Sequence, residues 1–430
     1  MQIYTASTVA DSFSGAIFAI EGIADAAVVL NGPTGCKFYH SATSDSQFPR
    51  SVDYDPLNYA ERCFFGQPRV PATYLDSDDY IFGSEMKLAE VLEIVAARDY
   101  SLIVVVNSPG AALIGDDLNR MLAQTVRQTP CFSLESSGFS GSFGEGFQTA
   151  LNKMIDLLDL PATEPDPMTV NLLGISLNQR YFDHNYATIR ELLALSGVQV
   201  ATAFGATDPL QKIATARQAA LNIVVCPENG LQTAKKLQDD WGTPYIVLDE
   251  GQPVGFSATE AMIAQVSAAL GTDPDAAYQN VEKARAVAYL QLSRYSSLLG
   301  LPKGALYSIR AQPSFAYPLA RWLSEYLGMI PSAIELVPGE DGGFVTRLND
   351  FLSSISCSHV LGKPVAETPS EVIFADADTI TTSRLTGITA ACIEIGYPVL
   401  SYLDITRKQL FGSEGALFLL EQIMNGLRFI

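Results

Sequence analysis

The stretch AAVVLNGPTGCKFYH, residues 26–40, indicates the fold because an apolar run ends in a tight glycine turn that is followed by a cysteine. A continuous apolar run bounded by turn residues is typical of a strand buried on both faces of a parallel sheet. Gly32 and Gly35 are expected to let the backbone approach a ligand and to adopt φ > 0. Cys36 would then follow the carboxyl end of a strand, where ligands bind in open α/β sheets.

Similar apolar runs recur along the chain, and each is followed by a turn and then a helical pattern. They occupy residues 102–106, 170–175, 223–226, 245–248, 371–375 and 398–400. Alternation of strands and helices predicts parallel sheets with helices on both faces. The expected fold class is therefore α/β.

The length of 430 residues predicts several domains of about 100–200 residues each. A proline-rich stretch at residues 161–167 reads as a linker, and a long helical pattern ends at the turn GLPKG, residues 300–304. We expect domains at residues 1–162, 168–275 and 300–430, with a connecting helix at residues 276–299.

The composition argues against nucleic-acid and membrane partners. The formal charge is −20, from 27 Lys and Arg against 47 Asp and Glu, and such a surface repels phosphate backbones. No apolar run approaches the ~20 residues of a membrane span, and the first residues lack a signal-peptide pattern. A cytoplasmic protein is expected, with no nucleic acid and no membrane as partner.

Six widely spaced cysteines, without a CxxC pair, are expected to be reduced in a cytosolic chain. Four of them lie in or beside apolar runs and are expected to be small buried hydrophobes: Cys131, Cys226, Cys357 and Cys392. The chain has only three histidines, which argues against a histidine-rich metal site.

Paired aspartates, Asp116 and Asp117, precede a helical pattern and are expected to cap it. No nucleophile elbow, Walker loop or GxGxxG turn is present, so hydrolase and dinucleotide-enzyme functions are disfavoured.

In order and spacing, these segments resemble the nitrogenase component 1 family, which includes the subunits of nitrogenase molybdenum–iron protein and light-independent protochlorophyllide reductase. The resemblance covers nearly the whole chain. The similar segments are NGPTGC (31–36), IFGSEMKL (81–88), LIGDDL (113–118), ESSGFSG (135–141), VNLLGIS (170–176), LNIVVCPENG (221–230), WGTPY (241–245), GFSATE (255–260) and the C-terminal stretch 397–423.

The resemblance implies three Rossmann-like domains and a subunit that pairs either with a homologous component 1 chain or with itself. In this family the paired subunits hold an iron–sulfur cluster at their interface. A separate ATP-dependent iron–sulfur reductase docks there and delivers electrons.

Cys36 matches one cluster ligand of the family, whereas the two other family positions, near residues 10–12 and at Pro109, carry no cysteine. Cys63 is an additional candidate ligand. Two cysteines from each of two subunits would complete the four-thiolate shell of a 4Fe–4S cluster, which favours this cluster over an 8Fe–7S cluster. Asp11 is an alternative carboxylate ligand.

Three functions follow from these patterns. The leading one is a nitrogenase-like reductase subunit that passes electrons through the cluster to an unidentified substrate. The alternatives are a cofactor-assembly scaffold of the same fold and a metal-free protein that binds a small ligand. Residues 402–411 lack the family's cofactor histidine and His359 is expected to be structural, so this chain alone is not expected to reduce dinitrogen.

Overall fold

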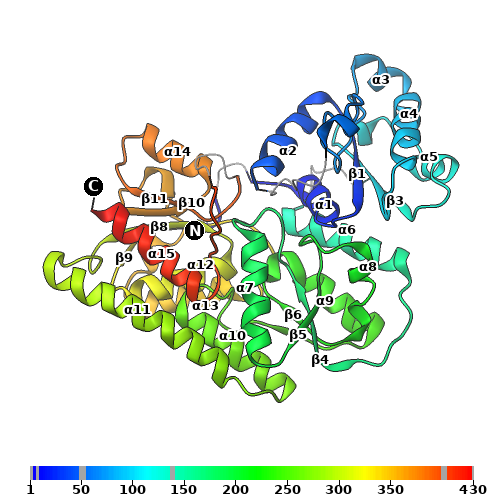
Figure 1. Ribbon diagram of the computed structural model, residues 1–430. Helices are drawn as coiled ribbons and strands as arrows, with labels where there is room; N and C mark the ends of the chain where they lie inside the picture. Colours follow the sequence, from blue (N-terminus) through cyan, green and yellow to red (C-terminus); the bar gives the residue numbers. More distant parts are fainter. Residues whose placement is uncertain (1–2, 6–8, 48–54, 136–140, 399–403, 429–430) are drawn as a thin grey trace.

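The computed structural model describes residues 3–5, 9–47, 55–135, 141–398 and 404–428. These residues form three parallel β-sheets with helices packed against them, which confirms the predicted α/β class (Figure 1). The strand orders are β1-β2-β3, β5-β4-β6-β7 and β11-β10-β8-β9. Within the described ranges, every helix is too short or too polar to span a bilayer.

The N-terminal sheet carries the glycine turn. Its strands are β1 (Ala26–Asn31), β2 (Leu102–Asn107) and β3 (Cys131–Leu134). β1 and β2 are buried along their whole length, as expected for valine-rich strands covered on both faces. They run parallel, with Asn31 opposite Asn107 at their carboxyl ends.

Two apolar clusters cover this sheet, one on each face, because successive residues of a strand point in opposite directions. Val28 and Leu30 face the cluster that includes α1 (Ser12–Glu21) and α6 (Phe143–Leu158). Ala27 and Val29 face the cluster that includes α4 (Glu85–Ala96) and α5 (Leu118–Thr125). The remaining helices of this region are α2 (Thr34–Gln47), η1 (Pro56–Tyr59), α3 (Ser77–Phe82) and η2 (Ala111–Leu113).

The middle sheet follows the same alternation of strand and helix. Its strands are β4 (Asp166–Leu173), β5 (Gln199–Ala203), β6 (Ala219–Val224) and β7 (Tyr245–Val247). Its helices are α7 (Phe182–Leu195), α8 (Leu210–Ile213), η3 (Ala216–Gln218), α9 (Pro227–Trp241) and α10 (Gly255–Leu270). The long helix α11 (Asp275–Leu299) then leads to the C-terminal sheet.

The C-terminal sheet is built in the same way. Its strands are β8 (Leu306–Ala311), β9 (Ile330–Leu336), β10 (Val372–Ala375) and β11 (Ala391–Glu394). Its helices are α12 (Pro313–Arg321), η4 (Trp322–Tyr326), α13 (Phe344–Ser354), η5 (Ser358–Val360), η6 (Val365–Glu367), α14 (Ala377–Leu385) and α15 (Gly412–Leu427).

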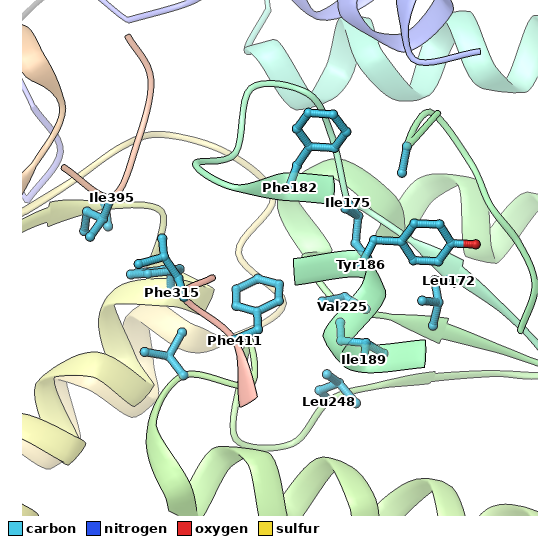
Figure 2. Packing of buried hydrophobic residues seen from close by; sticks show 14 of the residues in the cluster. Leu172, Ile175, Phe182, Tyr186, Ile189, Val225, Leu248, Phe315, Ile395 and Phe411 are labelled. Atoms are coloured by element: carbon cyan, nitrogen blue, oxygen red, sulfur yellow. The ribbon is translucent and has the colours of Figure 1, made fainter. Parts of the chain in front are cut away.

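One continuous apolar cluster joins the three regions, because buried side chains from all three sheets belong to it. Figure 2 shows part of this cluster, in which the rings of Phe315 and Phe411 lie 6.5 Å apart. Two segments cross between regions. Tyr4 pairs with Leu336 at the end of β9, and α15 packs against α10 and α11 (Figure 1).

Candidate ligand and cluster site at the domain junction

A hydrogen-bond network fixes the carboxyl edge of the N-terminal sheet. Asn31 donates to Asn107 Oδ1 at 2.8 Å and to Ser84 Oγ at 3.2 Å. Asp116 in turn accepts from the backbone N–H and the hydroxyl of Ser84, at 2.7 and 2.6 Å. Asp117 caps α5 by accepting from Arg120 N, as predicted. Asp116 therefore ties two of the sequence motifs together instead of capping a helix.

The two glycines of the turn have different surroundings. Gly32 donates its N–H to Thr73 Oγ1 at 3.0 Å, and a Cβ at this position would lie 2.7 Å from Ser108 Oγ. A Cβ at Gly35 would meet no atom within 4 Å. Neither residue adopts φ > 0, so that part of the prediction is wrong. Close approach of Ser108 explains Gly32, whereas Gly35 leaves open space beside Cys36.

Cys36 lies in the first turn of α2 and is half-buried. Burial raises the pKa of its thiol, and the carboxylate of Asp11 adds to this effect. Asp11 is the N-cap of α1, where its Oδ1 accepts from the backbone N–H and the hydroxyl of Ser14. The predicted alternative ligand Asp11 is thus close to Cys36 and is also engaged in capping.

Cys63 is placed differently. Its side chain is 5% exposed and belongs to the cluster of α4 and α5, whereas Cys36 packs against the cluster of α1 and α6. The carbonyl of Cys63 accepts from Ala72 N at 2.8 Å, which holds the loop against the edge of β1. The two predicted ligands pack against different apolar clusters, and the ligand role of Cys63 stays a prediction.

The other cysteines also divide into two groups. Cys226 is fully buried, as predicted, but Cys131, Cys357 and Cys392 are partly exposed, which corrects the prediction for these three. Cys131 and Cys392 lie on β3 and β11, which are edge strands and are covered less completely than central strands. His359 is exposed beside Cys357. Within the described ranges, no group of three or more His, Cys, Asp or Glu side chains is arranged to hold a metal ion.

A cavity of about 670 Å³ lies where the three regions meet. Cys36 and His40 of α2 line it, and Asp378 of α14 lines it from the C-terminal region. Figure 1 shows α2 and α14 as parts of these two regions. The polar side chains in its wall come from all three regions: His40, Asn178, Gln179, Arg180, Asn185, Glu228, Gln252, Arg310, Gln312, Asp376 and Asp378. Sequence analysis missed this set, since no local pattern links residues so far apart in the chain.

Two buried arginines in the cavity wall are held by carboxylates. Arg180 forms an ion pair with Asp404 and lies 3.3 Å from Glu394, while Arg310 pairs with Asp376. Both ion pairs are expected to contribute to the stability of the fold, because a buried charge without a partner lowers the free energy of unfolding. They place positive charge next to the cavity, compensated by acids of the C-terminal region.

Glu228 is a buried carboxyl, and within the described residues it forms no ion pair with a basic side chain. It accepts from Ser314 N at 2.9 Å and from Ser314 Oγ at 2.6 Å, and the Cys226 thiol lies 3.2 Å from Oε2. Burial raises the pKa of Glu228, although these hydrogen bonds act in the opposite direction. The cavity wall therefore contains a carboxyl group that gains a proton more readily than an exposed glutamate.

Large apolar side chains are exposed on the segments that follow the carboxyl edge of the N-terminal sheet. Their exposed fractions run from 65% for Phe38 to 89% for Met86. The set comprises Phe38, Tyr39, Ile81, Phe82, Met86 and Leu113. Exposed apolar groups gathered in one region are typical of a protein–protein interface.

Three parallel sheets meet around a cavity that has a half-buried cysteine in its wall, which defines a three-domain α/β protein with a candidate ligand site where the domains meet. The chain belongs to the nitrogenase component 1 type oxidoreductase family, which it matches over residues 12–428. This confirms the family predicted from the motifs. Residues 136–140 of the ESSGFSG segment lie outside the described residues.

The individual relatives match this chain at low identity and over only part of their length. The nitrogenase iron-molybdenum cofactor biosynthesis protein NifE of Nostoc sp. is 27% identical over 274 residues, which is 61% of this chain and 52% of that protein. The NifE protein of Methanococcus maripaludis is 30% identical over 244 residues, or 54% of this chain and 46% of that protein. The chain thus spans about half the length of these curated relatives.

Among solved structures, "Nitrogenase Cp1 at pH 6.5" superposes with a TM-score of 0.75, covering 99% of this chain and 94% of that chain at 15% identity. At that identity the likeness shows the fold alone. It agrees with the predicted component 1 architecture of three Rossmann-like domains.

Proposed function

We propose that this protein is a component 1-type assembly scaffold that holds a large cofactor precursor in the cavity at the domain junction. The cavity of about 670 Å³ carries this proposal, since all three regions contribute to its wall and its lining mixes polar and apolar side chains. The curated relatives that match over part of their length are named as cofactor biosynthesis proteins, which supports the same function.

An iron–sulfur cluster ligated by Cys36 is part of the proposal. The half-buried thiol lies in the cavity wall and on the helix that also exposes Phe38 and Tyr39. The described residues supply only part of a ligand shell, which fits a cluster shared with a second component 1 chain docked on the exposed apolar side chains. When bound, such a cluster supplies one-electron transfer.

A nitrogenase-like reductase is the second candidate function. It is favoured by one observation, namely that Cys36 lines the same cavity that would hold a substrate. In this function an ATP-dependent iron–sulfur reductase delivers electrons, and the residues of the cavity orient the substrate and exclude water. The third candidate function is the binding of a small ligand without a metal. In that case replacement of Cys36 is expected to change no spectroscopic property of the protein.

Iron and acid-labile sulfide analysis of the anaerobically purified chain tests the cluster. A 4Fe–4S cluster shared by two chains gives about two irons per chain. The value is expected to fall sharply in Cys36→Ala and to be unchanged in Cys131→Ala, the matched control with a partly exposed thiol on the same sheet. Iron that persists in Cys36→Ala, or is absent from the parent protein, contradicts the proposal.

Scaffold and reductase are then distinguished by the fate of the cavity ligand. A scaffold purified from its own host contains a bound metal-containing ligand and releases it unchanged to an acceptor protein. A reductase converts its ligand only when a low-potential electron donor and ATP-dependent reductase are added. Native mass spectrometry of the protein before and after reduction separates the two results.

A further inference from the structure

The residue one helical turn after Cys36 is His40, and both side chains line the cavity. Residues four apart on a helix have Cβ atoms about 5–6 Å apart on the same face. A cysteine and a histidine in this spacing have the types and the geometry of two ligands to one metal centre, as with helical histidine pairs four apart. His40 is 7% exposed, so it is held by its surroundings.

The ring of His40 is oriented by a buried carboxylate. Nε2 lies 2.8 Å from Oε2 of Glu21, and the hydroxyl of Ser44 donates to the other oxygen of the same carboxylate. A carboxylate only accepts hydrogen bonds, so a carboxylate at Glu21 takes Nε2 of His40 as its donor and leaves Nδ1 with the free lone pair.

The second ring nitrogen of His40 remains available. Within the described residues the ring makes no other hydrogen bond. The fully buried side-chain nitrogen and oxygen atoms that lack a partner do not include Nδ1 of His40. Metal-bound histidines commonly donate their other ring N–H to a carboxylate, which fixes the tautomer and the ring orientation. The Glu21–His40 pair has this arrangement before any metal is bound.

We infer that His40 is the second ligand that this chain gives to the iron–sulfur cluster at Cys36, with Nδ1 as the donor atom and Glu21 as the orienting group. The inference rests on the proposed cluster at Cys36. In this inference the two ligands of each chain are Cys36 and His40, on one face of a helix, and not Cys36 and Cys63, which pack on opposite faces of the sheet. Two such pairs, one from each chain of a dimer, supply four ligands in a mixed cysteine and histidine shell.

A nitrogen ligand has properties that a structural histidine lacks. Imidazole in place of thiolate raises the reduction potential of an iron–sulfur centre. It also couples the nitrogen nuclear spin to the unpaired electron of the reduced cluster, which pulsed EPR detects. Loss of the Glu21 carboxylate is expected to weaken iron binding by about 10-fold or more, as for other partners of metal-bound histidines.

The test uses the full chain, reconstituted anaerobically with iron and sulfide and reduced with dithionite. The expected results are a histidine nitrogen coupling in the parent protein, loss of that coupling and of most iron in His40→Ala, and retention of both in the exposed control His359→Ala. His40→Cys is expected to restore iron without the nitrogen coupling and to lower the potential.

Two results overturn the inference: an iron-loaded parent protein without nitrogen coupling, or a His40→Ala protein that keeps both coupling and iron. Labelling the parent protein with ¹⁵N-histidine changes the coupling pattern if the ligand is histidine, so the test holds even if His40→Ala does not fold. Failure of the proposed function is distinct, because iron is then absent from the parent protein or persists in Cys36→Ala.

Discussion

Cys36 and Cys63 lie on opposite faces of the N-terminal sheet, although both follow the first strand closely in sequence. Cys36 is in the wall of the cavity, whereas Cys63 is packed among the side chains of α4 and α5. Of these two cysteines, only Cys36 is therefore in the wall of the cavity between the domains.

Cys63→Ala separates a structural thiol from a ligand. Burial favours a structural role, so we expect a loss of about 1 kcal/mol in the free energy of unfolding, because a small apolar group is removed from a packed cluster. Iron content is expected to equal that of Cys131→Ala. Urea unfolding and iron analysis measure the two effects. A fall in iron would establish the ligand role predicted from the sequence and would count against His40.

Gly32→Ala is expected to destabilise the protein by about 1–3 kcal/mol, because the new Cβ would meet the buried side chain of Ser108. Gly35→Ala is the matched control on the same turn, and it is expected to change stability by less than about 1 kcal/mol in either direction. Urea unfolding of both variants gives the comparison. Equal stability of the two would show that Ser108 moves aside without cost.

Asp116→Ala removes the acceptor for both the backbone N–H and the hydroxyl of Ser84, which is fully buried. We expect a loss of about 1–3 kcal/mol, because buried donors are left without partners. Asp117→Asn keeps a capping side chain on α5 and should cost only a few tenths of a kcal/mol. The thermal midpoints of the two variants are the measurement. A similar shift in both would mean that the link to Ser84 contributes little.

Glu228 should make stability depend on pH. Its folded pKa is raised above the value of 4.5 for a free side chain, so the folded state binds more protons than the unfolded state between these two values. The free energy of unfolding therefore falls as pH rises through that window. Glu228→Gln is expected to flatten this slope and to be more stable above it by on the order of 1 kcal/mol.

Urea unfolding from pH ~5 to ~8 checks the Glu228 prediction, since the slope of stability against pH reports the difference in bound protons. The exposed Glu164→Gln is a suitable control, as Glu164 lies outside the wall of the cavity. An unchanged slope in Glu228→Gln would mean that the carboxyl is ionised in the folded protein throughout this range.

The strands and helices were predictable because their signals are local. A valine-rich run such as residues 102–106 predicts a buried strand in any sheet, and Asp117 precedes its helix as a cap. The family was predictable because its motifs occur in a fixed order. None of these signals required knowledge of which segments meet in space.

The site was only partly predictable, because it is assembled from distant segments. Cys36 follows directly from the glycine turn, but the pairing of His40 with Glu21 depends on how α2 packs against α1. The face occupied by Cys63 depends on the path of its loop beside β1, and the cavity wall depends on three domains at once. Residue types and spacing do not contain this information.

The residues that line the cavity run from Val9 to Phe411 in the sequence, and Tyr4 pairs with Leu336 of the C-terminal sheet. During synthesis the first domain therefore exists for a long time without the partners that enclose the cavity. Contacts between such distant residues form late in folding, because a long loop must close first. A ligand that needs all three walls can enter only a finished chain, so loading follows translation and does not accompany it.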